Sequence, residues 1–204
     1  MSMAFLEIDC EAGAAVEVAS TLATAEHLIT VQHVAAGHDL FVIAVAASMP
    51  ALADHLLTDL PRVPGVAKVR THVATRVFEA SRRWRLRVLP PVRAHAGRHF
   101  SAVLWLRMPD GLLEETGRAL LDWPETRTCA ALAGTRNMLL TVGLHTVSDR
   151  HPLVVRLEER FPYVRIDDRQ LVLRQSKLYG RLLDPAGRCA GVVPVDPWSL
   201  SSRT

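Results

Sequence analysis

Cysteine is scarce in this sequence of 204 residues, and no run of uncharged apolar residues is long enough to cross a bilayer. Three widely spaced thiols indicate neither a disulfide framework nor a paired-cysteine metal site, and they fit a reducing compartment. The first residues carry acidic groups and no basic segment, so they do not resemble a signal peptide. We therefore expect a cytoplasmic protein without a membrane partner, whose Cys10, Cys129 and Cys189 are reduced.

The sequence also lacks a strong charge of one sign. Lysine and arginine number 24 against 21 acidic residues, and they form no long basic block. Composition therefore gives no reason to expect nucleic-acid binding. Because a nucleophile elbow, an HExxH motif and a phosphate-binding glycine loop are all missing, we predict no catalytic residue, no cofactor and no enzymatic activity.

Nine histidines raise the question of a metal site. His33 and His38 are close in sequence, but one is predicted on a strand and the other in a turn, so they need not converge. No cysteine or carboxylate cluster completes a ligand set, and we predict no metal. His72 could line a cleft or be a satisfied surface residue, and we favour the second alternative.

What the chain does have is an internal repeat. Residues 33–47, HVAAGHDLFVIAVAA, return in altered form as ALAGTRNMLLTVGLHT at 131–146. Each copy has an apolar run, a small-residue turn with a polar side chain and a second run rich in β-formers, which is typical of a β-hairpin. Asp39 and Asn137 occupy the same point in the two copies, 98 positions apart. We therefore predict two copies of one structural unit.

Hydrophobic periodicity gives both copies the order β-α-β-β-α-β, the ferredoxin-like unit. Ser48 and Ser148 are expected to cap the second helix of each copy. A sheet with a bare apolar face must cover it, so we predict an α+β protein of two tandem ferredoxin-like units whose antiparallel sheets pack face to face. Strands are expected at 4–9, 28–35, 40–46 and 66–78, and again at 101–107, 126–132, 138–144 and 164–177.

The predicted domains are two units with a connecting segment and a tail. The connecting segment contains six arginines, a Pro-Pro pair and Trp84. It could be a basic strip with an aromatic platform for nucleic acid, but we favour a solvated tether. The first unit is placed at 1–80, the linker at 81–99, the second unit at 100–178 and the tail at 179–204.

The two hairpins and the segment LPRVPGV at 60–66, followed by Thr71, resemble the effector-binding (RAM) domain of the leucine-responsive/AsnC family of regulators. The second copy departs from the family pattern, because Asn137 stands where aspartate is common. The family's helix-turn-helix has no counterpart in this sequence. The DNA-reading part could lie in a longer parent chain, or the protein could sense a ligand without reading DNA.

The resemblance implies a module that senses a small amino-acid-like effector and forms homo-oligomers, with DNA contacted only through a helix-turn-helix. It places the effector beside the hairpin turns, where backbone N–H groups and Asp39 could hold a zwitterion. Asp39 and Asn137 could equally be turn formers only. The alternative function is an enzyme on a ferredoxin-like scaffold, a small oxygenase or a tetrapyrrole decarboxylase. The implied ligand-binding residues are Ala36, Gly37, His38, Asp39, Thr71, Gly134, Thr135, Arg136 and Asn137.

Overall fold

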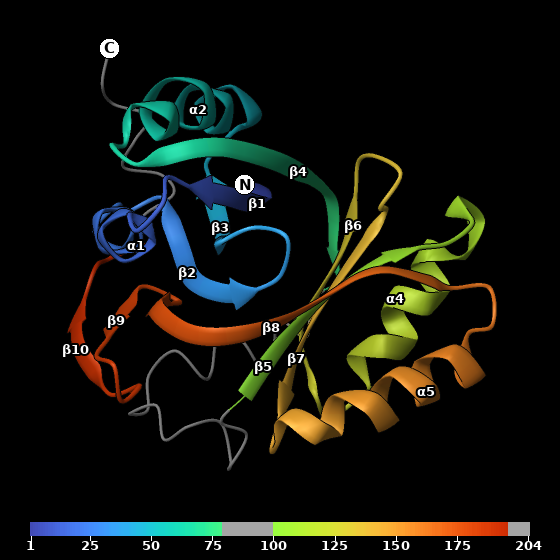
Figure 1. Cartoon of the computed structure of the whole chain (residues 1–204). Helices are drawn as coiled ribbons and strands as arrows, with labels where there is room; N and C mark the ends of the chain where they lie inside the picture. The colour runs from blue at the N-terminus through green and yellow to red at the C-terminus, as the bar shows by residue number, and fades with distance from the viewer. Residues whose placement is uncertain (79–99, 196–204) are drawn as a thin grey trace. The chain divides into compact units, whose positions relative to one another are not determined.

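The computed structural model describes residues 1–78 and 100–195, and these residues form two compact units. Unit 1 comprises Met1–Val73 and Leu173–Thr204, and unit 2 comprises Ala74–Val172. The predicted linker at 81–99 lies outside the described residues, as does the end of the predicted tail. The two units contain the α+β elements predicted from the repeat, in the same order in each copy (Figure 1). The face-to-face packing of the two sheets stays a prediction.

Unit 1 follows the order β-α-β-β-α-β predicted for the first copy. Its second helix starts at Ser48, whose hydroxyl accepts a hydrogen bond from the backbone N–H of Ala51 at 3.3 Å, as predicted. That helix continues through one π-helical and one 3-10 turn before the last strand. The elements are β1 (Ser2–Cys10), α1 (Ala15–Ala23), β2 (Leu28–Ala35), β3 (Leu40–Ala46), α2 (Met49–Asp54), η1 (His55–Asp59), η2 (Leu60–Arg62) and β4 (Val66–Phe78).

Unit 2 repeats this order, with one difference at the start of its second helix. Ser148 is not the cap that the sequence suggested. The carboxylate of Asp149 instead accepts hydrogen bonds from the N–H and the hydroxyl of Thr146, at 2.8 and 2.9 Å. The elements are β5 (Phe100–Arg107), η4 (Asp110–Leu112), α4 (Leu113–Leu121), β6 (Thr126–Leu132), β7 (Met138–Leu144), η5 (Val147–Asp149), α5 (Arg150–Arg160) and β8 (Arg165–Leu178).

Each of the two long strands, β4 and β8, lies partly in unit 1 and partly in unit 2. In unit 1, β1 pairs with β3 and with residues 66–73 of β4, and β2 pairs with β3. In unit 2, residues 74–78 of β4 pair with β6, and residues 165–171 of β8 pair with β5. The end of β8 returns to unit 1, where it pairs with β9 (Arg181–Leu183), which pairs with β10 (Cys189–Val192). The compact units are therefore divided within these strands rather than at the ends of the repeats.

The helices of each unit cover one face of its sheet. In unit 1, Ala4, Leu6 and Ile8 of β1 share a buried cluster with Val18 and Leu22 of α1. Because side chains alternate along a strand, Phe5, Glu7 and Asp9 lie on the opposite face. In unit 2, α4 and α5 pack into one cluster with β5, β6 and β7 (Figure 1).

None of the helices in the described ranges is long and apolar enough to cross a membrane.

Candidate functional site

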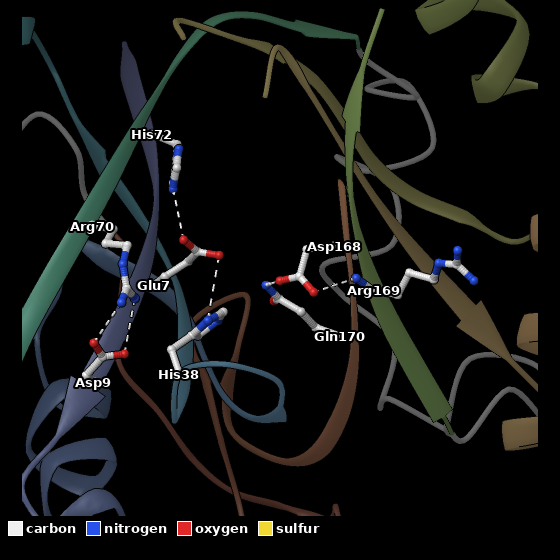
Figure 2. Close-up of polar contacts among 8 residues, drawn as sticks. All are labelled: Glu7, Asp9, His38, Arg70, His72, Asp168, Arg169 and Gln170. Carbon is white, nitrogen blue, oxygen red and sulfur yellow. Dashed lines mark hydrogen bonds and ion pairs between the residues drawn. The ribbon is translucent and has the colours of Figure 1, made fainter. Parts of the chain in front are cut away.

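A buried carboxylate between two imidazoles is the main polar feature of unit 1. Glu7 is 2% exposed. Its Oε2 lies 3.2 Å from Nε2 of His72, and its Oε1 lies 3.6 Å from Nδ1 of His38 (Figure 2). The side chain of His72 is 16% exposed and that of His38 is 3% exposed, so His72 is the member nearer to solvent. We call Glu7, His38 and His72 the acid-imidazole cluster.

The strand register explains why these three residues meet. Glu7 on β1 is directly opposite Arg70 on β4, and Phe5 is directly opposite His72. Directly paired residues share a face of the sheet, so His72 lies diagonally across from Glu7 on the face away from the helices. His38 enters from the turn between β2 and β3, where its neighbour Asp39 donates its backbone N–H to the carbonyl of Ile8 at 3.0 Å.

A second diagonal pair lies next to the cluster. Nη1 and Nη2 of Arg70 donate to Oδ1 and Oδ2 of Asp9 at 3.1 and 3.0 Å (Figure 2). This bidentate arrangement fits the planar guanidinium to the carboxylate. Both side chains are about one-third exposed, 36% for Arg70 and 28% for Asp9. On the same face, Lys68 is directly opposite Asp9 and is exposed.

Burying a carboxylate beside imidazoles has a chemical consequence. An isolated buried charge is costly, and hydrogen-bonding partners offset that cost. An imidazole that donates one ring nitrogen to a carboxylate has a fixed tautomer, and its other nitrogen can accept or donate a proton. In this cluster the hydrogen bond joins Nε2 of His72 to Glu7, whereas Nδ1 of His38 lies 3.6 Å from the carboxylate, which is an ion-pair distance. A carboxylate beside imidazoles is the kind of arrangement that general acid-base chemistry uses.

The repeat places different chemistry at the corresponding positions of unit 2. Trp105 occupies the position equivalent to Glu7. It is directly opposite Asp168 on β8, just as Glu7 is directly opposite Arg70 on β4. The guanidinium of Arg136, at the position of His38, lies 4.6 Å from the Trp105 ring centroid. Gln170 replaces His72 and donates to Asp168 at 2.9 Å (Figure 2). The acid-imidazole chemistry therefore belongs to unit 1 alone among these equivalent positions.

The predicted turn residues of unit 1 have different surroundings. Ala36 and Gly37 are exposed, whereas the side chain of His38 is turned inward to Glu7. Asp39 is exposed, and its Oδ2 accepts a hydrogen bond from the backbone N–H of Cys10 at 2.8 Å. Thr71 is exposed on β4. Asp39 thus has a structural role as an anchor of the turn, and ligand binding by these residues stays a prediction.

In unit 2 the corresponding turn residues are used differently. Gly134 has φ +121°, a backbone conformation that suits glycine, and both it and Thr135 are exposed. Arg136 lies over Trp105, as described above. Asn137 is buried: its Oδ1 accepts from the N–H of Met108, and its Nδ2 donates to the Met108 carbonyl and to Asp110. Since the amide has only two N–H donors, none remains for a ligand.

The sequence interpretation missed Glu7 and placed His72 on the surface. A signal was present, because Glu7 interrupts an apolar strand, AFLEI, at a position where the second copy has tryptophan. An acidic residue in a strand of this kind is expected to be buried only with partners. The partners themselves could not be found from the sequence, because they lie 31 and 65 residues away along the chain.

Comparison with solved structures shows the same fold over most of the chain. The siroheme decarboxylase NirDL, crystallised with an iron-uroporphyrin III analogue, matches with a TM-score of 0.62 and 11% identity, over 86% of this chain and 72% of that chain. NirDL in a second crystal structure matches with a TM-score of 0.59 and 9% identity, over the same shares. A putative chlorite dismutase matches with a TM-score of 0.51 and 11% identity, over 90% of this chain and 95% of that chain. At these identities the likeness establishes the fold.

The sequence comparisons locate one known domain. A search of curated proteins found no match. The model of the Lrp/AsnC ligand binding domain matches residues 3–84, the part of the chain that carries the acid-imidazole cluster. Residues 3–84 are therefore an Lrp/AsnC ligand-binding (RAM) domain, as the hairpin and the LPRVPGV segment predicted.

Proposed function

We propose that this chain binds a tetrapyrrole with carboxylate side chains and catalyses its decarboxylation. The observation that carries the proposal is the acid-imidazole cluster of Glu7, His38 and His72, found in a fold that NirDL shares over 86% of this chain. The proposal differs from the expectation of a non-enzymatic sensor, which was based on the lack of known catalytic motifs. A cluster assembled from distant strands leaves no such motif.

The chemistry requires a proton donor that sits beside the leaving carboxylate. When the bond between carbon and carboxylate breaks, CO₂ leaves and the electron pair stays on carbon. A proton must then be added to that carbon, so that one carboxylate group is replaced by one hydrogen. His72 is suited to this role, because Nε2 faces Glu7 and the opposite nitrogen, Nδ1, can deliver a proton. Glu7 would hold the ring in place.

The same face of the sheet offers cations for the remaining carboxylates of such a ligand. Lys68 is exposed and lies on this face, and Arg70 is 36% exposed. Charge-assisted hydrogen bonds from these groups favour a ligand with several acidic side chains over a neutral ring. We therefore expect affinity to fall as ionic strength rises.

Titration of the purified protein with siroheme tests the binding step. We expect saturable changes in the siroheme absorbance spectrum with wild type, and at least about 100-fold weaker binding for the double variant Lys68→Gln/Arg70→Gln, because two charge-assisted contacts are lost. Arg118→Gln in unit 2, a change at an exposed arginine paired with Glu114, is the matched control. Spectra that stay unchanged at all protein concentrations would contradict tetrapyrrole binding.

A second candidate is amino-acid sensing, which the match to the Lrp/AsnC ligand binding domain favours. The exposed Asp39 would take the ammonium group of the effector, whereas Arg136 at the second turn would repel it. Asp39→Asn should then weaken binding roughly 10- to 150-fold, because a charged hydrogen bond contributes about 1.5 to 3 kcal/mol. Calorimetry with a panel of amino acids tests this, and if no member of the panel binds, this candidate is wrong.

A further inference from the structure

We infer that Asp9 is a positioning residue, which holds the Arg70 guanidinium away from Glu7 and thereby keeps Glu7 available to His38 and His72. The inference rests on the proposed function, since it assigns a role within the same site. It depends only on residues of unit 1.

The register makes Arg70 a competitor for Glu7. These two residues are the direct pair across β1 and β4, while His72 reaches Glu7 only on the diagonal. Side chains in direct pairs start about 5 Å apart and those on the diagonal about 7 to 8 Å apart. On distance alone, the long side chain of Arg70 would therefore reach the Glu7 carboxylate more easily than His72 does.

Chemistry also favours Arg70 in that competition. A guanidinium remains charged at all relevant pH values and can grip a carboxylate through two parallel hydrogen bonds, whereas an imidazole offers one. If Arg70 paired with Glu7, the carboxylate would be occupied by a group that cannot release its proton. His72 would then lose the hydrogen-bond partner that fixes its tautomer.

Asp9 prevents the pairing of Arg70 with Glu7. Asp9 lies diagonally across from Arg70 and accepts two parallel hydrogen bonds from its guanidinium. Both terminal nitrogens of Arg70 are directed to the two oxygens of Asp9, at 3.1 and 3.0 Å (Figure 2). The side chain of Asp9 is 28% exposed and that of Glu7 is 3% exposed, so pairing with Asp9 also keeps the guanidinium in the position that is more accessible to solvent. Desolvation of Arg70 beside Glu7 is thereby avoided.

Unit 2 provides an internal comparison. Its position equivalent to Asp9 is Arg107, which forms an ion pair with Asp167 at 3.1 Å. That unit has Trp105 in place of Glu7, so its ion pair does not keep an arginine away from a buried carboxylate at this position. Loss of the pair in unit 2 should remove only a partly exposed ion pair, which usually contributes little. Asp167→Ala is therefore a matched control for Asp9→Ala.

The test compares Asp9→Ala, Arg70→Gln, the double variant Asp9→Ala/Arg70→Gln and the control Asp167→Ala. Nitrogen-15 NMR of the histidine rings, without any ligand, reports the tautomer of His72. We expect the Nε2–H form in wild type, in Arg70→Gln, in the double variant and in the control, and a mixture of tautomers in Asp9→Ala. At saturating siroheme, the maximal rate of decarboxylation should fall by about 100-fold in Asp9→Ala, in the range of general acid-base effects, and should rise again in the double variant, although the loss of Arg70 weakens siroheme binding in that variant.

The outcomes separate this inference from the proposed function. If Asp9→Ala leaves the His72 tautomer as in wild type, or if removing Arg70 does not restore it, Asp9 has no positioning role. The inference is also overturned if Arg70→Gln alone disturbs His72 as much as Asp9→Ala does. If the NMR pattern is as expected but wild type does not decarboxylate siroheme, the proposed function fails while the positioning role of Asp9 stands.

Discussion

The side chain of Asn137 accepts a hydrogen bond from the backbone N–H of Met108, 29 residues earlier in the chain. The side chain of Asp39 accepts the equivalent bond from the backbone N–H of Cys10, also 29 residues earlier. In unit 2 the contact is double, since Oδ1 accepts from the N–H of Met108 and Nδ2 donates to its carbonyl. The hairpin turn of each copy is therefore fastened to the end of its first strand. The two copies of the repeat therefore share an equivalent hydrogen bond between the turn side chain and the backbone.

Replacement of Asn137 by alanine should destabilise unit 2. The side chain is buried, and its loss leaves the N–H and the carbonyl of Met108 without the partners that they have in the native structure. We expect a loss of about 2 to 4 kcal/mol in the free energy of unfolding, from two buried backbone groups. Urea denaturation measures it. Asp39→Ala, at an exposed residue with one such bond, is the comparison, and an equal or larger loss there would contradict this assignment.

Gly117 in α4 should not tolerate a side chain. A Cβ at this position would lie 2.5 Å from the ring of Phe78, whereas a Cβ at Gly111 would meet nothing within 4 Å. Overpacking of this kind costs about 1 to 3 kcal/mol. Gly117→Ala should therefore lower the thermal midpoint, while Gly111→Ala should leave it nearly unchanged. Equal midpoints for the two variants would show that Phe78 can move aside.

His27 should make unit 1 less stable in acid. Burial, followed by the neighbouring His55, lowers the pKa of His27 from 6.5 to about 4, and the two rings stack with centroids 4.1 Å apart. In the window between those values the unfolded chain binds more protons than the folded chain, so stability rises with pH from about 4 to 6.5. We expect about 2 kcal/mol from this residue after allowing for its partial exposure.

Urea denaturation between pH 4 and pH 7 checks this, with His27→Gln and the exposed His151→Gln as a pair. The His27 variant should lose part of the pH dependence of wild type, and the His151 variant should keep it. If both variants keep the full pH dependence, the acid sensitivity arises from other groups.

The elements of the fold could be predicted from the sequence because local patterns determine them. The strands Leu28–Ala35, Leu40–Ala46, Val66–Phe78, Thr126–Leu132 and Met138–Leu144 begin and end where periodicity and turn residues placed them. The division of β4 and β8 between two units could not be predicted. An alternating pattern defines a strand but does not specify its partners, and these long strands have different partners along their length.

The candidate site was only partly predictable for the same reason. His38 was identified from the turn that resembles the RAM domain, but its contact with Glu7 depends on the register of β1. His72 was favoured as a surface residue, yet the pairing of β1 with β4 places it on the same face of the sheet as Glu7. Asn137 was predicted to bind a ligand because of its place in the second turn, and the structure gives it a role as an anchor of the Met108 main chain.

The central claim is that the acid-imidazole cluster of unit 1 transfers a proton during decarboxylation. Mass spectrometry of siroheme after incubation with excess protein tests it most directly, with wild type, His72→Gln, Glu7→Gln and Gln170→Ala, the last at the equivalent position of unit 2. We predict a product that has lost CO₂ with wild type and Gln170→Ala, and at least about 100-fold slower loss with His72→Gln and Glu7→Gln. Unchanged siroheme with wild type, or equal rates for wild type and His72→Gln, would contradict the account.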